Sequence, residues 1–100
     1  MVRSSRGRGT SLAIDSAGDA HITYYDEGNF DLKYAVKSGG VWQVETVDSD
    51  NIVGQQARIA VDALGRPHIT YMDYTDGALQ YATKSGGVWS LCIRTTCRFG

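Results

Sequence analysis

The sequence predicts an all-β fold made of two similar four-stranded antiparallel units, and three observations predict it. The segment from Ser11 to Trp42 returns without a gap from Arg58 to Trp89, so that matching residues lie 47 positions apart. Within each copy the apolar residues alternate with a period of two, which is typical of strands. Short sequences rich in Gly, Asp and Ser separate these stretches, as tight turns require.

The first unit opens with a strand in which Leu12 and Ile14 alternate with their neighbours. The sequence Asp15-Ser-Ala-Gly18 follows, and it predicts a tight turn. The aspartate side chain can accept a hydrogen bond from the backbone two residues on, and the glycine can adopt the left-handed conformation. The next strand, His21–Asp26, is rich in β-branched and aromatic residues.

A polar loop from Glu27 to Asp31 leads into a third strand, Leu32–Lys37. The Ser38-Gly39-Gly40 turn then leads into a fourth strand, from Val41 to about Val47. Four strands in 47 residues leave no room for a helix.

The second unit repeats this order, with its loop from Tyr74 to Ala78, and its fourth strand is expected to include Leu91, Ile93 and Thr95. Shifted by 47 positions, residues 1–10 fall on the connection between the two units. The expected divisions are a linker-like segment at 1–10, a first unit with its connecting loop at 11–57, a second unit at 58–95, and a C-terminal tail at 96–100 without a counterpart.

Four-stranded units repeated at this spacing are typical of β-propeller blades. Two isolated blades would leave one broad apolar face exposed at each end, and repeat proteins depend on contacts between neighbours for their stability. We therefore expect homo-oligomerisation to complete a closed propeller by head-to-tail contacts. A trimer with six blades is preferred, and a tetramer with eight is the alternative.

The patterns A-x-D-x-x-G-x-x-H-I-T-Y and L-x-Y-A-x-K-S-G-G-V-W resemble blades of bacterial β-propellers of the BNR and sialidase-like groups. The resemblance covers residues 11–47 and 58–95. Gly39 and Trp42 match the Gly and Trp of the Asp-box turn, but Lys37 stands at its Asp position, so the turn is a degenerate version. The arginines and the Tyr/Glu pair of sialidases have no placed counterparts, so the resemblance does not extend to their activity. The Asp-x-x-Gly hairpin is also similar to NHL-type blades, which implies a binding scaffold.

Charge and composition exclude several classes of function. The formal net charge of −1 argues against a nucleic-acid binder. No apolar run approaches the roughly 18 residues that a membrane span needs, and the N-terminus lacks the apolar stretch of a secretory signal. The chain as written is therefore expected to be cytoplasmic, without cofactor or metal; its location within a longer precursor is left open.

Cys92 and Cys97 are expected to be free thiols, with a local bridge as the alternative.

The residues that differ between the copies are the best candidates for ligand binding, because surface loops on a rigid scaffold carry function. We expect a non-catalytic module that binds carbohydrate or protein. Two alternatives remain: a glycosidase, which would need a pair of carboxylates, and a truncated repeat fragment without activity of its own. The candidate binding residues are Glu27, Asn29, Phe30, Tyr74 and Asp76 in the loops, with His21 and His68, which could instead serve packing.

Overall fold

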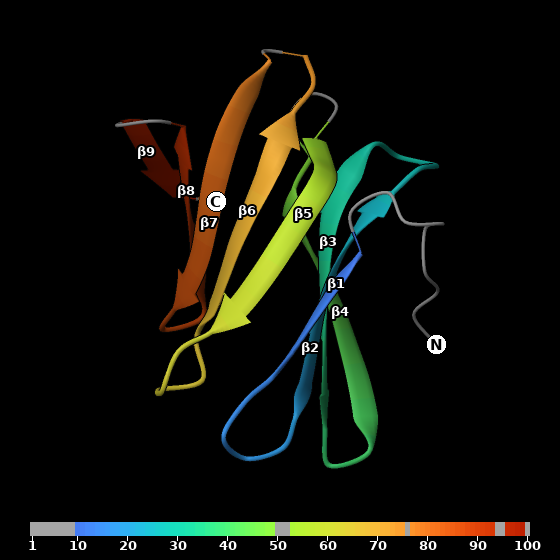
Figure 1. Ribbon diagram of the computed structural model, residues 1–100, viewed down its shortest axis with the longest axis vertical. Coiled ribbons are helices and arrows are strands. Elements are labelled where there is room, and N and C mark those ends of the chain that lie inside the picture. Colours follow the sequence, from blue (N-terminus) through green and yellow to red (C-terminus); the bar gives the residue numbers. More distant parts are fainter. Residues whose placement is uncertain (1–9, 50–52, 76, 94–95, 100) are drawn as a thin grey trace.

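A computed structural model of the chain describes residues 10–49, 53–75, 77–93 and 96–99. Within these ranges the chain forms strands and turns, so the all-β prediction is confirmed (Figure 1). No helix in the described residues is long and apolar enough to cross a membrane.

The strands form two antiparallel sheets in which each strand pairs with its neighbour in sequence. The first sheet has four strands, in the order β1 (Ser11–Ile14), β2 (Ala20–Asp26), β3 (Asp31–Ser38) and β4 (Val41–Asp48). The second sheet has five, in the order β5 (Val53–Val61), β6 (Pro67–Asp73), β7 (Ala78–Ser85), β8 (Val88–Ile93) and β9 (Thr96–Phe99).

The hairpin between β1 and β2 has the predicted turn chemistry. The backbone N–H groups of Ala17 and Asp19 both donate to Asp15 Oδ1, each at 2.9 Å. Gly18 has a φ of 86°, in the left-handed region that a glycine adopts without steric cost. Asp62 and Gly65 repeat these features in the hairpin between β5 and β6.

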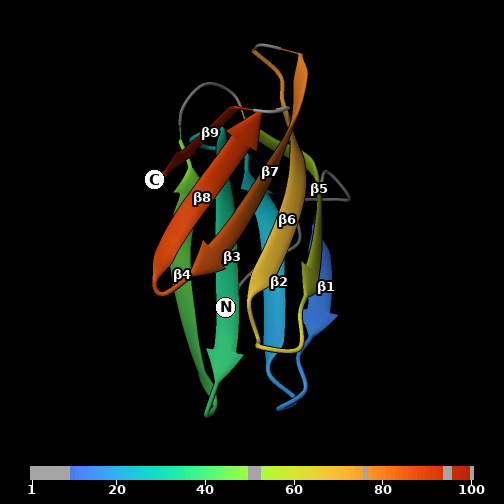
Figure 2. The ribbon, with the colours of Figure 1, turned by 90° about the vertical axis from the view of Figure 1, so that its left-hand side faces the viewer.

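The two sheets pack against each other face to face, as the two perpendicular views show (Figures 1 and 2). Strand β5 lies against β1, β2 and β3 of the first sheet. The apolar core lies between the layers, with Leu32 and Tyr34 from the first sheet and Ile69, Tyr71 and Trp89 from the second. Each sheet therefore buries one face against the other.

Strand β5 begins at Val53, inside the segment expected to be a connecting loop. The Val53 N–H donates to the Phe30 carbonyl oxygen at 3.1 Å, which ties the start of β5 to the first sheet. Gly54 follows with a φ of 103°, and a Cβ atom on it would lie 2.9 Å from the Leu32 Cα. This close packing between sheets, rather than any alternating pattern, extends β5 toward the N-terminus.

The tail beyond the second unit forms strand β9, which pairs with β8. In this pairing Cys92 lies opposite Cys97 in the backbone register. Cys92 is disulfide-bonded, and none of the cysteines that the structure describes is free. The expectation of free thiols is wrong, because a hairpin that the sequence pattern does not predict brings the positions of the two cysteines together.

Candidate functional site

A hydrogen-bonded network of three side chains joins the β1–β2 turn to β2 and β3. The Nε2 atom of His21 lies 2.8 Å from Asp15 Oδ2, and its Nδ1 atom lies 2.6 Å from Tyr34 Oη. When the carboxylate accepts the Nε2–H of a neutral imidazole, Nδ1 is left to accept the tyrosine hydroxyl proton. His21 and Tyr34 are both buried, whereas Asp15 in the turn is half-buried.

The network changes the acidity of its members. The hydrogen bond from His21 lowers the pKa of Asp15, and the bond from the Asp19 N–H acts in the same direction. Burial raises the pKa of Tyr34 to about 12, and the negative charges of Glu45 and Asp15 add to this effect. At neutral pH the network therefore holds an ionised aspartate and a protonated tyrosine.

The second unit carries the same network with a different degree of exposure. The Nε2 atom of His68 lies 2.9 Å from Asp62 Oδ2, and its Nδ1 atom lies 2.5 Å from Tyr81 Oη. The hydrogen bond from His68 lowers the pKa of Asp62, which also accepts a 2.8 Å bond from Arg66 Nε. Tyr81, however, is 37% exposed, whereas Tyr34 is 4% exposed.

The hydrogen-bond distances are similar whether the tyrosine is buried or exposed, which indicates that the network holds the turn against the two strands. In each copy the Nδ1 atom of the histidine lies within hydrogen-bond distance of a tyrosine hydroxyl. No group of three His, Cys, Asp or Glu side chains in the described ranges is placed to hold a metal ion.

Trp89 covers the first network from the second sheet. Its ring meets Tyr34 edge to face, with 5.3 Å between centroids and 77° between planes. Its Nε1–H donates to Glu45 Oε1 at 2.7 Å, and Lys84 Nζ donates to the other carboxylate oxygen at 2.6 Å. Glu45 thus anchors the second sheet to the first.

A second set of polar contacts lies in the buried layer, one between the two sheets and one within the second sheet. The Tyr71 hydroxyl donates to Asp48 Oδ2 at 2.8 Å, and Gln80 Nε2 donates to Asp73 Oδ2 at 2.7 Å. All four residues are buried. The sequence pattern does not predict these contacts or the Glu45 anchor, because Glu45, Asp48 and Gln80 differ from their counterparts Cys92, Thr95 and Lys33.

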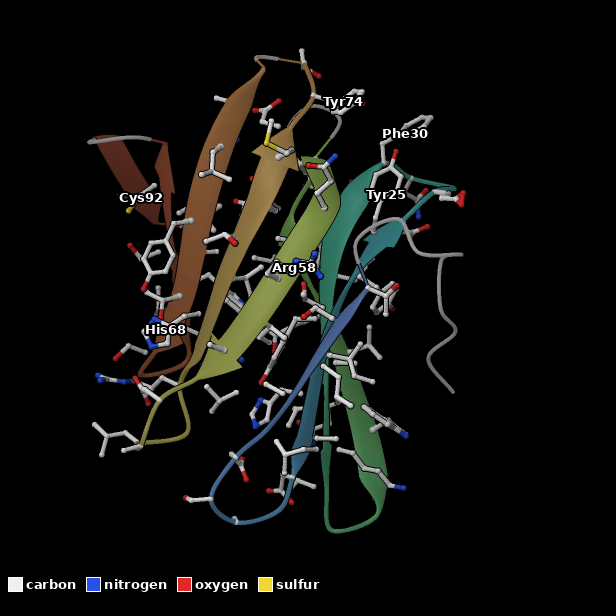
Figure 3. The ribbon with its side chains drawn as sticks, in the orientation of Figure 1. Tyr25, Phe30, Arg58, His68, Tyr74 and Cys92 are labelled. Carbon is white, nitrogen blue, oxygen red and sulfur yellow. The ribbon has the colours of Figure 1, made fainter. Side chains whose placement is uncertain are left out.

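Each sheet has one face that is turned away from the other sheet and carries exposed apolar side chains. The first-sheet free face is defined by Leu12, Ile14, Tyr24, Trp42 and Val44, of which Tyr24 and Trp42 are half-buried. The second-sheet free face is defined by His68, Met72, Leu79 and Tyr81, of which His68 and Met72 are half-buried. Figure 3 shows His68 on the side of the second sheet that is turned away from the first.

The predicted loop residues lie at one end of the sheets. Tyr25, Phe30 and Tyr74 gather at this end, and His68 lies toward the opposite end (Figure 3). Phe30 and Tyr74 are exposed, as is Glu27, while the exposed Asn29 donates its side-chain N–H to Asp26 Oδ2 at 3.0 Å. Asp76 lies outside the described residues.

Two features set Phe30 apart within the loop end. Its φ of 61° lies in the left-handed region, where its counterpart Gly77 has a φ of 64°. A residue other than glycine in this conformation lowers stability by about 1–2 kcal/mol. Phe30 nevertheless occupies it and remains 48% exposed. Phe30 thus lies at the same end of the sheets as Tyr74 and far from His68.

Comparison with protein-family models, curated proteins and solved structures finds no significant match to this chain. The contacts and exposed surfaces of the chain itself are therefore the basis for a functional assignment.

Proposed function

We propose that the chain is a non-catalytic two-blade unit that associates head to tail with its own copies. The closed β-propeller formed in this way would bind carbohydrate or protein through its loops. One observation carries the proposal: the residues on the two free faces are the 47-residue counterparts of residues that are buried or half-buried on the covered faces.

The second-sheet free face matches the covered face of the first sheet. Leu79 is 61% exposed, and its counterpart Leu32 is fully buried. Tyr81 and Tyr34 differ in the same way. The second sheet is therefore equipped to receive a further sheet as the first sheet receives the second.

The first-sheet free face matches the covered face of the second sheet. Val44 is 52% exposed, and its counterpart Leu91 is 4% exposed. Tyr24 is half-buried, whereas its counterpart Tyr71 is completely buried. One copy can thus offer the face that another copy can cover.

A contact between two different faces leaves one free face on each partner, so it forms a ring or grows into a filament. Closure with about four to eight blades is typical of propellers. Three copies would give six blades, and four would give eight. We favour the trimer.

A non-catalytic role is supported by the two Asp–His–Tyr networks. The first network has similar hydrogen-bond distances beneath Trp89, where Tyr34 is buried and its pKa is raised to about 12. The shared hydrogen bonds are explained by their position, because in each unit they join the first hairpin turn to the two strands that follow it.

Light scattering over a dilution series tests the assembly. We expect one species of three or four chains, and we expect Leu79→Lys or Val44→Lys to give monomers, because each buries a charge at the contact. Leu64→Lys is the matched control, because Leu64 lies in the β5–β6 turn and is 76% exposed.

Mixing the two charged variants distinguishes head-to-tail association from a symmetric dimer. Leu79→Lys retains an intact first-sheet free face, and Val44→Lys retains an intact second-sheet free face. The mixture should form one-to-one dimers and nothing larger. A wild-type chain that remains monomeric, or a mixture that stays dissociated, would contradict the proposal.

The loop end is the proposed ligand-binding surface. Phe30 and Tyr74 are exposed at the same end of the two sheets, and aromatic rings can contact sugars or protein side chains. A ring would repeat this surface and convert weak single sites into avidity. We expect the assembled protein to bind on a glycan or protein array, and Phe30→Ala to weaken binding without changing the mass in solution. Equal binding by this variant would exclude Phe30 from the site.

A further inference from the structure

The contact between Trp89 and Tyr34 gives a template for the contact between copies. The rings of Trp89 and Tyr34 meet edge to face, and Lys84 Nζ lies 6.0 Å from the Trp89 ring centroid. Lysine and tryptophan face each other across the β7–β8 pairing, so they approach the first sheet together.

The first-sheet free face presents the same pair of residues. Lys37 faces Trp42 across the β3–β4 pairing, and Lys37 Nζ lies 5.9 Å from the Trp42 ring centroid. The arrangement that Lys84 and Trp89 have in contact with Tyr34 is therefore already formed on the outer side of the first sheet.

The second-sheet free face presents the receiving surface. The rings of His68 and Tyr81 lie 5.9 Å apart, and those of His21 and Tyr34 lie 5.8 Å apart. Because Tyr81 is over a third exposed, its ring is available to a tryptophan from another molecule.

The receiving surfaces differ at several positions, and one of them is the residue that anchors Trp89 and Lys84. Glu45 lies opposite Tyr34 across β3–β4, and it accepts the hydrogen bonds of Trp89 and Lys84. Cys92 lies opposite Tyr81 across β7–β8. Cys92 is disulfide-bonded, so it cannot ionise to replace the carboxylate.

We infer that Trp42 of one copy packs on Tyr81 of the next, and that burial of apolar surface rather than a carboxylate anchor holds this contact. The inference rests on the proposed head-to-tail assembly. It implies that the contact between copies is weaker than the one within the chain, because it lacks the charge-assisted hydrogen bonds of Glu45. It also implies little dependence on salt.

Tryptophan fluorescence tests the packing of Trp42. The chain has two tryptophans, so Trp89→Phe leaves Trp42 as the sole reporter, and Trp42→Phe is the matched control. As the protein concentration and the mass of the species in solution rise, emission from Trp42 should shift to shorter wavelength. Adding Tyr81→Ala should abolish this shift.

A second pair of variants tests the missing carboxylate without relying on Trp89→Phe. The test variant is Cys92→Glu/Cys97→Ser, and its control is Cys92→Ser/Cys97→Ser. Both lack the disulfide, and only the test variant supplies an anion opposite Tyr81. We expect the glutamate variant to associate about tenfold more tightly at low salt, with the gain lost at high salt. Circular dichroism checks that both variants fold.

The outcomes separate this inference from the proposed assembly. If the wild-type chain assembles but Trp42 shows no shift, or if the glutamate gives no salt-dependent gain, the inference is overturned and the assembly stands. If the wild-type chain does not assemble, both are overturned.

Discussion

At the scale of single residues, the surroundings rather than the identity of a side chain decide what it does. Tyr34 and Tyr81 each lie within hydrogen-bond distance of a histidine ring nitrogen. Only Tyr34 is covered by a tryptophan from the facing sheet, and it is buried beside the charge of Glu45. The tyrosine of the same Asp–His–Tyr network is thus buried in the first unit and exposed in the second.

The raised pKa of Tyr34 predicts a loss of stability in alkali. The folded-state pKa is about 12, whereas an unperturbed tyrosine has a pKa of about 10. The unfolded chain therefore releases this proton first, and the contribution to stability, complete below pH ~10, is lost as the pH rises toward 12. Urea denaturation at a series of pH values should show a shallower decline for Tyr34→Phe than for the wild-type chain.

Tyr74→Phe provides the control, because Tyr74 is exposed in the β6–β7 loop. It should follow the wild-type profile. Parallel profiles for all three proteins would show that Tyr34 does not govern the alkaline limit.

At the scale of secondary structure elements, contacts between sheets extend strands beyond their sequence signals. The residues around Gly54 lack a clear alternating pattern, yet β5 begins at Val53 because its backbone packs on Leu32 and bonds to Phe30. Register shifts interrupt the pairing of β5 with β6 between Val53 and Arg58. This part of β5 follows the surface of the first sheet.

The fit of Gly54 predicts that Gly54→Ala is strongly destabilising. A Cβ atom would meet Leu32 backbone at 2.9 Å, and the φ of 103° adds strain. We expect a loss of about 3 kcal/mol in the free energy of unfolding, by adding the cost of the backbone conformation to that of overpacking. Chemical denaturation measures it.

Gly86→Ala is the matched control for Gly54→Ala. Gly86 also has a positive φ, of 60°, but open space surrounds the position of its Cβ. It should lose about 1 kcal/mol from backbone strain alone. Equal losses for the two variants would exclude the contact with Leu32 as the cause.

At the scale of the whole molecule, the two units are alike in sequence but occupy different positions in the stack of sheets. Glu45 and Asp48 provide carboxylates where the second sheet meets the first. Cys92 and Thr95 stand at the corresponding positions of the second unit, and Thr95 lies outside the described residues. Within the described residues, these two carboxylates therefore join the two units of the chain.

The sequence by itself determined most strands, the Asp-x-x-Gly and Gly-Gly turns, and the pairing order, because alternation and turn chemistry act over a few neighbouring residues. Tertiary structure decided which copy of each repeated residue is buried, as His21 and His68 show from the same His-Ile-Thr-Tyr context. It also decided where β5 begins, that β9 forms, and that Tyr71 bonds to Asp48. Burial and long-range hydrogen bonds depend on what lies opposite a face, and no local pattern encodes that neighbour.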